Sequence, residues 1–180
     1  MLTTSRRPTG RIRTFCRDLA NSIQDVTRVN RGKMSLYGVA EKALELEANQ
    51  VIVVNRWRGE PGKINLFQVS STGLKAAPPL MLMKRIRLRR EFEEGRRYAR
   101  SSAITLESKD SADLERIAGL LSKYFCLPIL SPDKARKNHR ACMHFSIDSS
   151  GHIQITFMLL SRDIEIGPRI TLSKLIWDVT

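Results

Sequence analysis

The chain has 180 residues, of which 42% are hydrophobic, so it is long enough and apolar enough to bury a core. Its 31 Lys and Arg residues against 18 Asp and Glu give a net charge of +13, which predicts salt-sensitive attraction to a polyanion. This composition excludes a disordered basic tail, and no apolar run reaches the ~18–20 residues that a membrane-spanning helix needs. The charged N-terminus also lacks the apolar stretch of a secretory signal. We therefore expect a cytoplasmic protein (nucleolar in a eukaryote) whose polyanion is nucleic acid and not a membrane.

The first half of the chain is predicted to run strand, helix, helix and three strands. Pro8 opens a helical pattern, and the β-branched run at 51–54 is typical of a central strand that is buried on both faces. The expected elements are a strand at 2–5, helices at about 8–23 and 36–44, a strand at 51–54, a turn at 59–62, a strand around 64–67, a loop at 70–77 and a long strand from about 80 to 92.

After a charged connector at 93–100, the same order of elements begins again. The pattern predicts a strand at 103–106, a helix with its apolar face over 114–125, a polar loop at 131–139, strands around 143–147 and 153–159, and a last strand from about 166 to 177. The sequence therefore predicts an α/β fold made of one domain with two similar halves, 1–98 and 99–180, with mixed sheets related by pseudo-symmetry.

The three cysteines, Cys16, Cys126 and Cys142, are isolated and lack CxxC spacing. Neither a disulfide framework nor a zinc ribbon is indicated. We expect three small buried side chains in a reducing compartment.

The start of the first helix carries cations where acids are usual. A helix N-terminus bears about half a positive charge, so arginine there is unfavourable by ~0.3–1 kcal/mol. By contrast, the corresponding helix of the second half begins with the ordinary acidic residues Asp110 and Asp113. A bound anion such as an RNA phosphate would resolve the conflict; solvated arginines whose cost is tolerated are the alternative. The basic residues expected at the two helix starts are Arg6, Arg7, Arg11, Arg28, Arg31 and Lys33, and Gly10 and Gly32 would let the backbone approach the ligand.

A second basic pattern lies on the long strand of the first half. Alternation with a period of two places Arg85, Arg87 and Arg89 along one face, roughly 6.6–7 Å apart. That spacing approximates the spacing of phosphates along one nucleic-acid strand, although a solvated edge strand protected against aggregation would look similar. A third cluster, less specific, is expected in a loop: Lys134, Arg136, Lys137, His139 and Arg140.

Aromatic residues make up only 6% of the chain, and no basic strand carries a Phe/Tyr pair for base stacking. Recognition of single-stranded nucleic acid through base stacking on aromatic side chains is therefore not favoured. Contacts to the phosphate backbone of folded RNA fit the sequence better.

Motifs that would indicate an enzyme are weak. The sequence has no phosphate-binding loop and no dinucleotide fingerprint. Cys142 and His144 share a strand face with only His152 nearby as a further metal ligand, and Asp148, Asp163 and Asp178 lie in contexts that do not suggest paired nuclease carboxylates. We expect no catalytic residue, no metal, no cofactor and no small-molecule substrate.

Four segments, in order along nearly the whole chain, resemble the Brix-domain proteins of ribosome biogenesis. They are Leu2-Thr3-Thr4-Ser5-Arg6-Arg7-Pro8, Asn30-Arg31-Gly32, Arg58-Gly59-Glu60-Pro61-Gly62 and Ile166-Gly167-Pro168-Arg169-Ile170-Thr171-Leu172. The first and last segments together are fairly specific.

The resemblance implies two similar α/β halves like those of the anticodon-binding domain of some aminoacyl-tRNA synthetases. It also implies binding to precursor ribosomal RNA in ribonucleoprotein particles, with ribosome assembly proteins as further partners. Gly167, Pro168 and Arg169 would correspond to the family segment that has been likened to a sigma-factor motif for nucleic-acid contact. Because the chain lacks long charged extensions, it looks like the short archaeal form, closest to the small-subunit-processome branch.

The sequence thus predicts a non-catalytic RNA-binding factor that assists the processing or folding of precursor ribosomal RNA. An RNA-processing enzyme, either a nuclease or a modification enzyme, and a protein-interaction scaffold in a pre-ribosomal particle are the alternatives.

Overall fold

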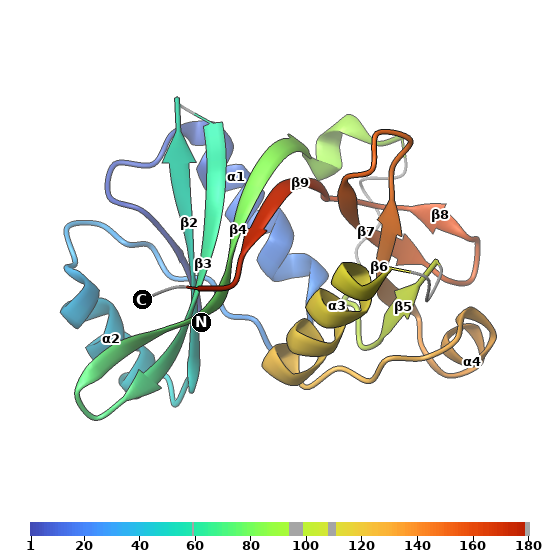
Figure 1. The fold of residues 1–180 in the computed structure, drawn as a ribbon. Helices are drawn as coiled ribbons and strands as arrows, with labels where there is room; N and C mark the ends of the chain where they lie inside the picture. Colours follow the sequence, from blue (N-terminus) through green and yellow to red (C-terminus); the bar gives the residue numbers. More distant parts are fainter. Residues whose placement is uncertain (59, 94–98, 108–110, 179–180) are drawn as a thin grey trace. The chain divides into compact units, whose positions relative to one another are not determined.

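The protein has an α/β fold with a mixed sheet (Figure 1). This computed structural model describes residues 1–58, 60–93, 99–107 and 111–178. Within those ranges the sheet has nine strands in the order β1-β2-β3-β4-β9-β7-β6-β5, with β8 paired to β7, and there are four α-helices. The chain divides into two compact units, which we describe separately. Unit 1 comprises Met1–Ala20, Val26–Met83 and Ser173–Thr180, and unit 2 comprises Asn21–Asp25 and Lys84–Leu172.

Unit 1 is built around a parallel pair of strands with helical segments between them in the sequence. Its elements are β1 (Leu2–Thr4), most of α1 (Gly10–Ser22), α2 (Leu36–Glu45), β2 (Gln50–Trp57), β3 (Glu60–Ser70), β4 (Gly73–Arg87) up to Met83, and the end of β9 (Arg169–Ile176). Strands β1 and β2 are parallel, whereas β2–β3 and β3–β4 are antiparallel.

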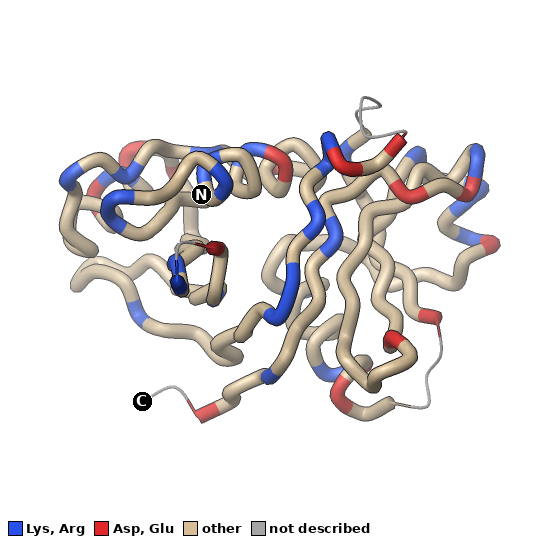
Figure 2. Tube along the Cα trace, turned by 90° about the horizontal axis from the view of Figure 1, so that it is seen from above, with Lys and Arg blue, Asp and Glu red and all other residues tan. Residues whose placement is uncertain are grey.

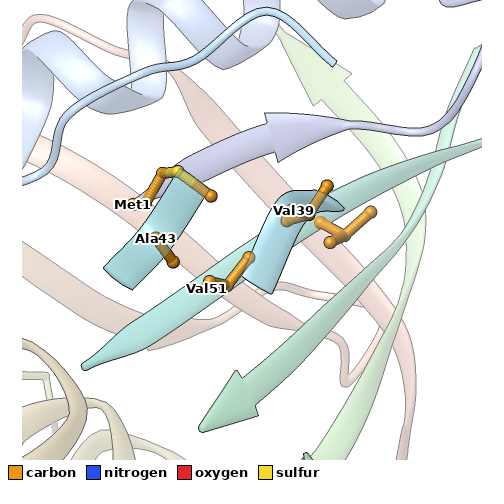
Figure 3. Packing of buried hydrophobic residues seen from close by; sticks show 5 residues of the cluster. Met1, Val39, Ala43 and Val51 are labelled. Atoms are coloured by element: carbon orange, nitrogen blue, oxygen red, sulfur yellow. The ribbon is translucent and has the colours of Figure 1, made fainter. Parts of the chain in front are cut away.

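The run of β-branched residues in β2 explains why this strand is central. Residues Val51 to Val54 are all buried, so both faces of the strand are covered, as the sequence predicted. On one face, Val51 and Val53 pack with Met1 and with Val39 and Ala43 of α2 (Figure 3). The apolar stripe of α1, predicted from its helical spacing, is buried as well.

Unit 2 repeats this order of elements. It contains β5 (Ile104–Leu106), α3 (Ala112–Phe125), α4 (Pro132–Asn138), β6 (Ala141–Ile147), β7 (Ile153–Leu159), β8 (Ile164–Glu165) and the beginning of β9, together with the end of β4 and a 3-10 turn, η1 (Arg89–Glu91). Strands β5 and β6 are parallel, and β6–β7, β7–β8 and β7–β9 are antiparallel.

Helix α3 forms where the sequence predicted it. Its N-cap Ser111 accepts a hydrogen bond from the main chain of Leu114, acids occupy its first turn, and the helix ends at Cys126 in the left-handed conformation. Leu114, Ile117 and Leu121 form its buried stripe. The other predicted acid of this helix start, Asp110, lies outside the described residues.

Several sequence-based expectations about local structure were wrong. Residues 60–62, expected in a turn, belong to β3. Residues 73–77 belong to β4 and not to a loop, because only a two-residue turn joins β3 to β4. The long strand ends at Arg87 and not near 92, and 132–138 form helix α4 where a loop was expected, with Pro132 in its first turn. The last strand begins at Arg169, after Gly167 and Pro168, because Gly167 takes a positive φ that interrupts the extended backbone.

The two units share the order of elements. In each of them one pair of strands is parallel and the following pairs are antiparallel. The expected boundary at residue 98 lies outside the described residues. The division into halves 1–98 and 99–180, and their relation by pseudo-symmetry, therefore stay predictions. None of the helices in the described ranges is long and apolar enough to cross a membrane.

Two of the three cysteines are buried, and Cys126 is exposed, contrary to the expectation that all three would be buried. Burial raises the pKa of the Cys16 thiol to about 12, against the smaller opposing effect of Arg28, and burial also raises the pKa of Cys142.

We therefore expect only Cys126 to react rapidly with a thiol reagent such as dithionitrobenzoate at pH 8, because thiolate and access are both needed for reaction. The released thionitrobenzoate should correspond to one thiol in the folded protein and to three in denaturant. The fast phase should vanish in Cys126→Ser; if it persisted, Cys16 or Cys142 would have to be accessible.

Candidate nucleic-acid interface

The parallel pairing of β1 with β2 brings distant basic segments to one end of unit 1. Thr4 lies opposite Val54, and the main-chain nitrogen of Ser5 donates to the carbonyl oxygen of Val54 at 2.8 Å. Both strands therefore end at the same edge of the sheet, where Arg6 and Arg7 follow β1. We call this edge, with the start of α1 and the 28–35 loop, the basic end of unit 1. Figure 2 marks the Lys and Arg positions of the described chain in blue along the trace.

The start of α1 carries cations without a compensating acid in its own first turn, as the sequence predicted. Thr9 precedes the helix, and its hydroxyl accepts a hydrogen bond from the main chain of Ile12 at 3.4 Å. Arg11 reaches outside the helix to Glu60 of β3, with 2.7 Å between Nε and Oε2. This ion pair links the helix start to the hairpin formed by β2 and β3.

The 28–35 loop is held to the end of β1 by arginine side chains. Arg31 is 7% exposed and donates hydrogen bonds to the carbonyl oxygens of Met34 and Thr4 at 2.9 and 3.3 Å. Burial, and secondly the positive charge of Arg6, lower the pKa of Arg31. Arg6 donates to the same Met34 carbonyl oxygen at 3.3 Å, so residues from both segments meet there.

The second helix starts at Leu36, where the sequence predicted it. Its N-cap is Ser35, whose hydroxyl accepts a hydrogen bond from the main chain of Gly38, so Arg28, Arg31 and Lys33 lie in the preceding loop and not in the first helical turn. That first turn does lack an acid. Arg28 donates to the Asn30 side chain at 2.6 Å and is half-buried.

The structure thus brings the basic residues predicted for unit 1 together but gives them different surroundings. Arg6, Arg7 and Lys33 are exposed, Arg11 and Arg28 are partly buried, and Arg31 is buried. Gly10 and Gly32 both have open space where a Cβ would stand, and Gly32 has a φ of +54°, which favours glycine. A ligand could approach the backbone at both positions.

In unit 2 the expected row of three arginines is broken after two. Arg85 and Arg87 are exposed on β4, but Arg89 lies in the 3-10 turn that follows the strand and is 2% exposed. The Arg89 guanidinium donates to the Ser22 hydroxyl at 3.2 Å, and that hydroxyl donates to the carbonyl oxygen of Gly167 at 3.2 Å. Arg89 therefore stabilises the interior of unit 2 instead of extending a basic row.

Gly167 and Arg169 lie against the ring of Phe92. The Arg87 and Arg169 guanidinium carbons lie 4.1 and 5.7 Å from the centroid of the Phe92 ring. Arg87 also donates to the Glu91 carbonyl oxygen, and Arg169 forms a two-point ion pair with Glu165, which raises the pKa of Arg169. Gly167 and Pro168 are buried, and Arg169 is partly buried. Of the two arginines over the Phe92 ring, Arg87 is the more exposed.

Sequence reasoning missed three residues of the basic end. Arg56, Trp57 and Arg58 follow the buried part of β2 and are exposed, and Trp57 is 70% exposed. Their signal in the sequence is the abrupt change from a β-branched run to an arginine–tryptophan–arginine triplet at the end of a central strand.

The residues considered for metal binding or catalysis have other partners. The Thr105 hydroxyl lies 3.3 Å from the Cys142 sulfur and 2.9 Å from Nδ1 of His144, and burial lowers the pKa of His144. Asp148 accepts hydrogen bonds from the main chain of Ser150 and His152. Asp163 forms an ion pair with Arg136 of α4 at 2.8 Å, and Asp178 is exposed. Among the residues that the structure describes, no three His, Cys, Asp or Glu side chains are grouped to hold a metal ion.

Comparison of the sequence with known proteins finds relatives but no matching family model. A probable Brix domain-containing ribosomal biogenesis protein of Aeropyrum pernix is 36% identical over 94 residues, which cover 52% of this chain and 52% of the relative. A protein of the same description from Pyrobaculum aerophilum is 26% identical over 132 residues, 72% of this chain and 70% of the relative. In the first of these alignments the chain thus spans about half the length of the relative.

Solved structures match over nearly the whole chain. The probable ribosomal biogenesis protein from Aeropyrum pernix matches with a TM-score of 0.76 at 24% identity, over 97% of both chains. Mil, an archaeal Imp4-like protein, matches with a TM-score of 0.67 at 22% identity, over 98% of both chains. The resemblance predicted from four short segments is confirmed: in sequence and in fold the chain is similar to the archaeal Brix domain-containing ribosomal biogenesis proteins and to an archaeal Imp4-like protein.

Proposed function

We propose that this chain is a non-catalytic RNA-binding factor in ribosome biogenesis, which binds precursor ribosomal RNA and assists its processing or folding. The curated relatives carry the description of ribosomal biogenesis proteins, and the net charge of +13 suits a polyanionic ligand. Ribosome assembly proteins would be further partners.

The observation that carries the proposal is the basic end of unit 1. Exposed Arg6 and Arg7 precede the start of α1, exposed Lys33 precedes the start of α2, and neither helix has an acid in its first turn. Hydrogen bonds of Arg31 and the ion pair of Arg11 hold the chain conformation there. Free main-chain N–H groups, the helix dipole and guanidinium groups all favour an anion at such a position. RNA phosphates have the charge and the repeat needed to engage several of these groups at once.

Unit 2 would add a second set of phosphate contacts through Arg85 and Arg87, which are exposed on β4. Arg169 would contribute only in part, because Glu165 already neutralises it. Gly167, Pro168 and Arg89 would act indirectly, since they are buried. Gly167 lies against Phe92 and Arg89, and Arg87 and Arg169 lie over the Phe92 ring.

The basic end can be tested by reversing the charge at Arg7. With folded ribosomal RNA in a filter-binding titration at several salt concentrations, Arg7→Glu should bind roughly 10-fold more weakly than the wild type at moderate salt. Its slope of log affinity against log salt should be smaller by about 1, because one phosphate contact and its released counterion are lost.

Lys75→Glu is the matched control, since it makes the same change in net charge. Lys75 is exposed in unit 1, but it lies beside the β3–β4 turn, at the opposite end of the strands from the basic end. The affinity of Lys75→Glu for the same RNA should fall less than about 2-fold at the same salt concentration. Equal losses for the two variants would mean that only net charge matters, and a flat salt dependence of the wild type would contradict RNA binding through phosphates.

The two alternative functions lead to different results in the same preparation. Asp148 accepts main-chain hydrogen bonds and Asp163 is paired with Arg136, so these two carboxylates lend no support to a nuclease. Cleavage of precursor RNA by the pure protein, lost in Asp163→Asn, would favour the enzyme. Unchanged RNA affinity in a folded Arg6→Glu/Arg7→Glu variant would favour a protein scaffold.

A further inference from the structure

Trp57 is the most exposed large hydrophobic side chain among the described residues, at 70%. It is the last residue of β2, and its cross-strand partner is Glu60 at the first position of β3. Its neighbours Arg56 and Arg58 are exposed cations. A large aromatic side chain left in water between two cations has no role in the core of unit 1.

The main chain beneath Trp57 is fixed by close packing within the hairpin. A Cβ added to Gly62 would lie 2.2 Å from the Trp57 Cβ and 2.9 Å from its main-chain nitrogen, distances that no real side chain adopts. Only glycine therefore permits the β3 strand to pass so close to Trp57. The pairing shifts by one residue between Asn55 and Arg56, and such an irregularity redirects the side chains that follow it.

The same hairpin is fastened to the start of α1. Glu60, opposite Trp57, forms the 2.7 Å ion pair with Arg11 in the first turn of the helix. Ser5, which leads into Arg6 and Arg7, is hydrogen-bonded to Val54, three residues before Trp57 on the neighbouring strand. In Figure 1 the tip of β2 and the beginning of α1 lie at the same end of this unit. Trp57 therefore lies at the same end of unit 1 as the proposed phosphate-binding residues.

We propose that Trp57 stacks on an unpaired nucleobase of the RNA whose phosphates are bound at the basic end of unit 1. This proposal rests on the proposed function and adds to it a preference for RNA with an unstacked base next to a helix. Stacking on a tryptophan face is tolerant of base identity, and flanking arginines can hold the adjacent phosphates. A single exposed aromatic residue provides one such contact and not the continuous platform of a single-strand reader.

Trp57 can be observed directly by fluorescence in a Trp177→Phe background, because the chain contains two tryptophans. The probes are two RNA hairpins of equal length and stem, one with a single unpaired adenosine bulge and one with an abasic nucleotide at that place. We expect the adenosine RNA to quench Trp57 at saturation and the abasic RNA to leave its emission nearly unchanged.

The RNA affinities of Trp57 variants should likewise differ between the adenosine hairpin and the abasic hairpin. Trp57→Ala should weaken binding of the adenosine hairpin by roughly 5- to 100-fold and leave binding of the abasic hairpin unchanged. Trp57→Phe should retain most of the affinity, whereas Trp57→Leu, which is apolar without a π-face, should behave like alanine. Because the side chain is exposed, all three variants should unfold at nearly the wild-type urea midpoint.

Different outcomes of this experiment would contradict RNA binding and contradict stacking of Trp57. If the wild type binds neither hairpin with a steep salt dependence, RNA binding itself is wrong. If it binds both hairpins steeply while Trp57 emission and Trp57→Ala affinity do not distinguish adenosine from the abasic site, stacking is wrong and RNA binding stands. A leucine variant as good as wild type would also overturn stacking and would indicate an apolar contact, such as one with a protein.

Discussion

Replacing Gly167 by alanine should lower the free energy of unfolding by about 2–5 kcal/mol. The new Cβ would lie 2.6 Å from Cε2 and 2.7 Å from Cδ2 of the Phe92 ring, so the ring would have to move. The residue also has a φ of +65°, which costs an L-amino acid roughly 1–2 kcal/mol, and forcing an extra carbon into a packed interior adds roughly 1–3 kcal/mol. Urea unfolding followed by circular dichroism measures the sum.

Gly151→Ala separates the two contributions. Gly151 also lies in unit 2 with a positive φ, +78°, but nothing stands within 4 Å of its Cβ position. This variant should lose only the roughly 1–2 kcal/mol of backbone strain. In a Phe92→Leu background, where the ring is absent, the cost of Gly167→Ala should fall toward that value. Equal losses for Gly151→Ala and Gly167→Ala in the wild-type background would show that Phe92 does not press on Gly167.

Replacing Arg89 by alanine should destabilise the protein by about 2–4 kcal/mol. The side chain is 2% exposed, and its guanidinium is hydrogen-bonded to Ser22, which in turn bonds to the carbonyl oxygen of Gly167. Truncation leaves a cavity and removes a charge-assisted hydrogen bond in the interior. Arg89→Met, which fills more of the space, should recover part of the loss. Thermal or urea unfolding gives the difference.

Arg90→Ala is the control for this prediction, because Arg90 is the adjacent residue of the same turn and is exposed. Its free energy of unfolding should stay within about 0.5 kcal/mol of wild type. RNA binding should distinguish Arg85 on β4 from Arg89 in the turn. Arg85→Ala should reduce the slope of log RNA affinity against log salt by about 1, and a folded Arg89→Met protein should keep the wild-type slope. A reduced slope for Arg89→Met would show that Arg89 contacts a phosphate after all.

These two predictions divide the residues that the sequence assigned to RNA binding. Gly167 and Arg89 belong to the packed surroundings of Phe92, over which Arg87 and Arg169 are held. Their substitution should impair function through stability and through the position of those arginines. Arg6, Arg7, Lys33 and Arg85 are exposed and should act by direct contact.

The sequence by itself determined the features that follow from local periodicity. The four-residue β-branched run of β2 could be buried only as a central strand, and the helical spacing and acidic start of α3 specified both its buried stripe and its N-terminus. The absence of acids at the starts of α1 and α2 was equally visible, because it is a property of adjacent residues. The order of the strands in the two halves was visible as well, although α4 was expected as a loop.

Only the tertiary structure decided which cations are available to a ligand. Alternation placed Arg89 on the exposed face of a strand, but a 3-10 turn after Arg87 ends the alternation and directs Arg89 toward Ser22, 67 residues away in the sequence. Arg31 is likewise buried because carbonyl oxygens of Thr4 and Met34 accept its hydrogen bonds. Trp57, at the end of a strand whose preceding run is buried, is instead 70% exposed. A long side chain is buried or exposed according to its distant partners, and local patterns contain no information about them.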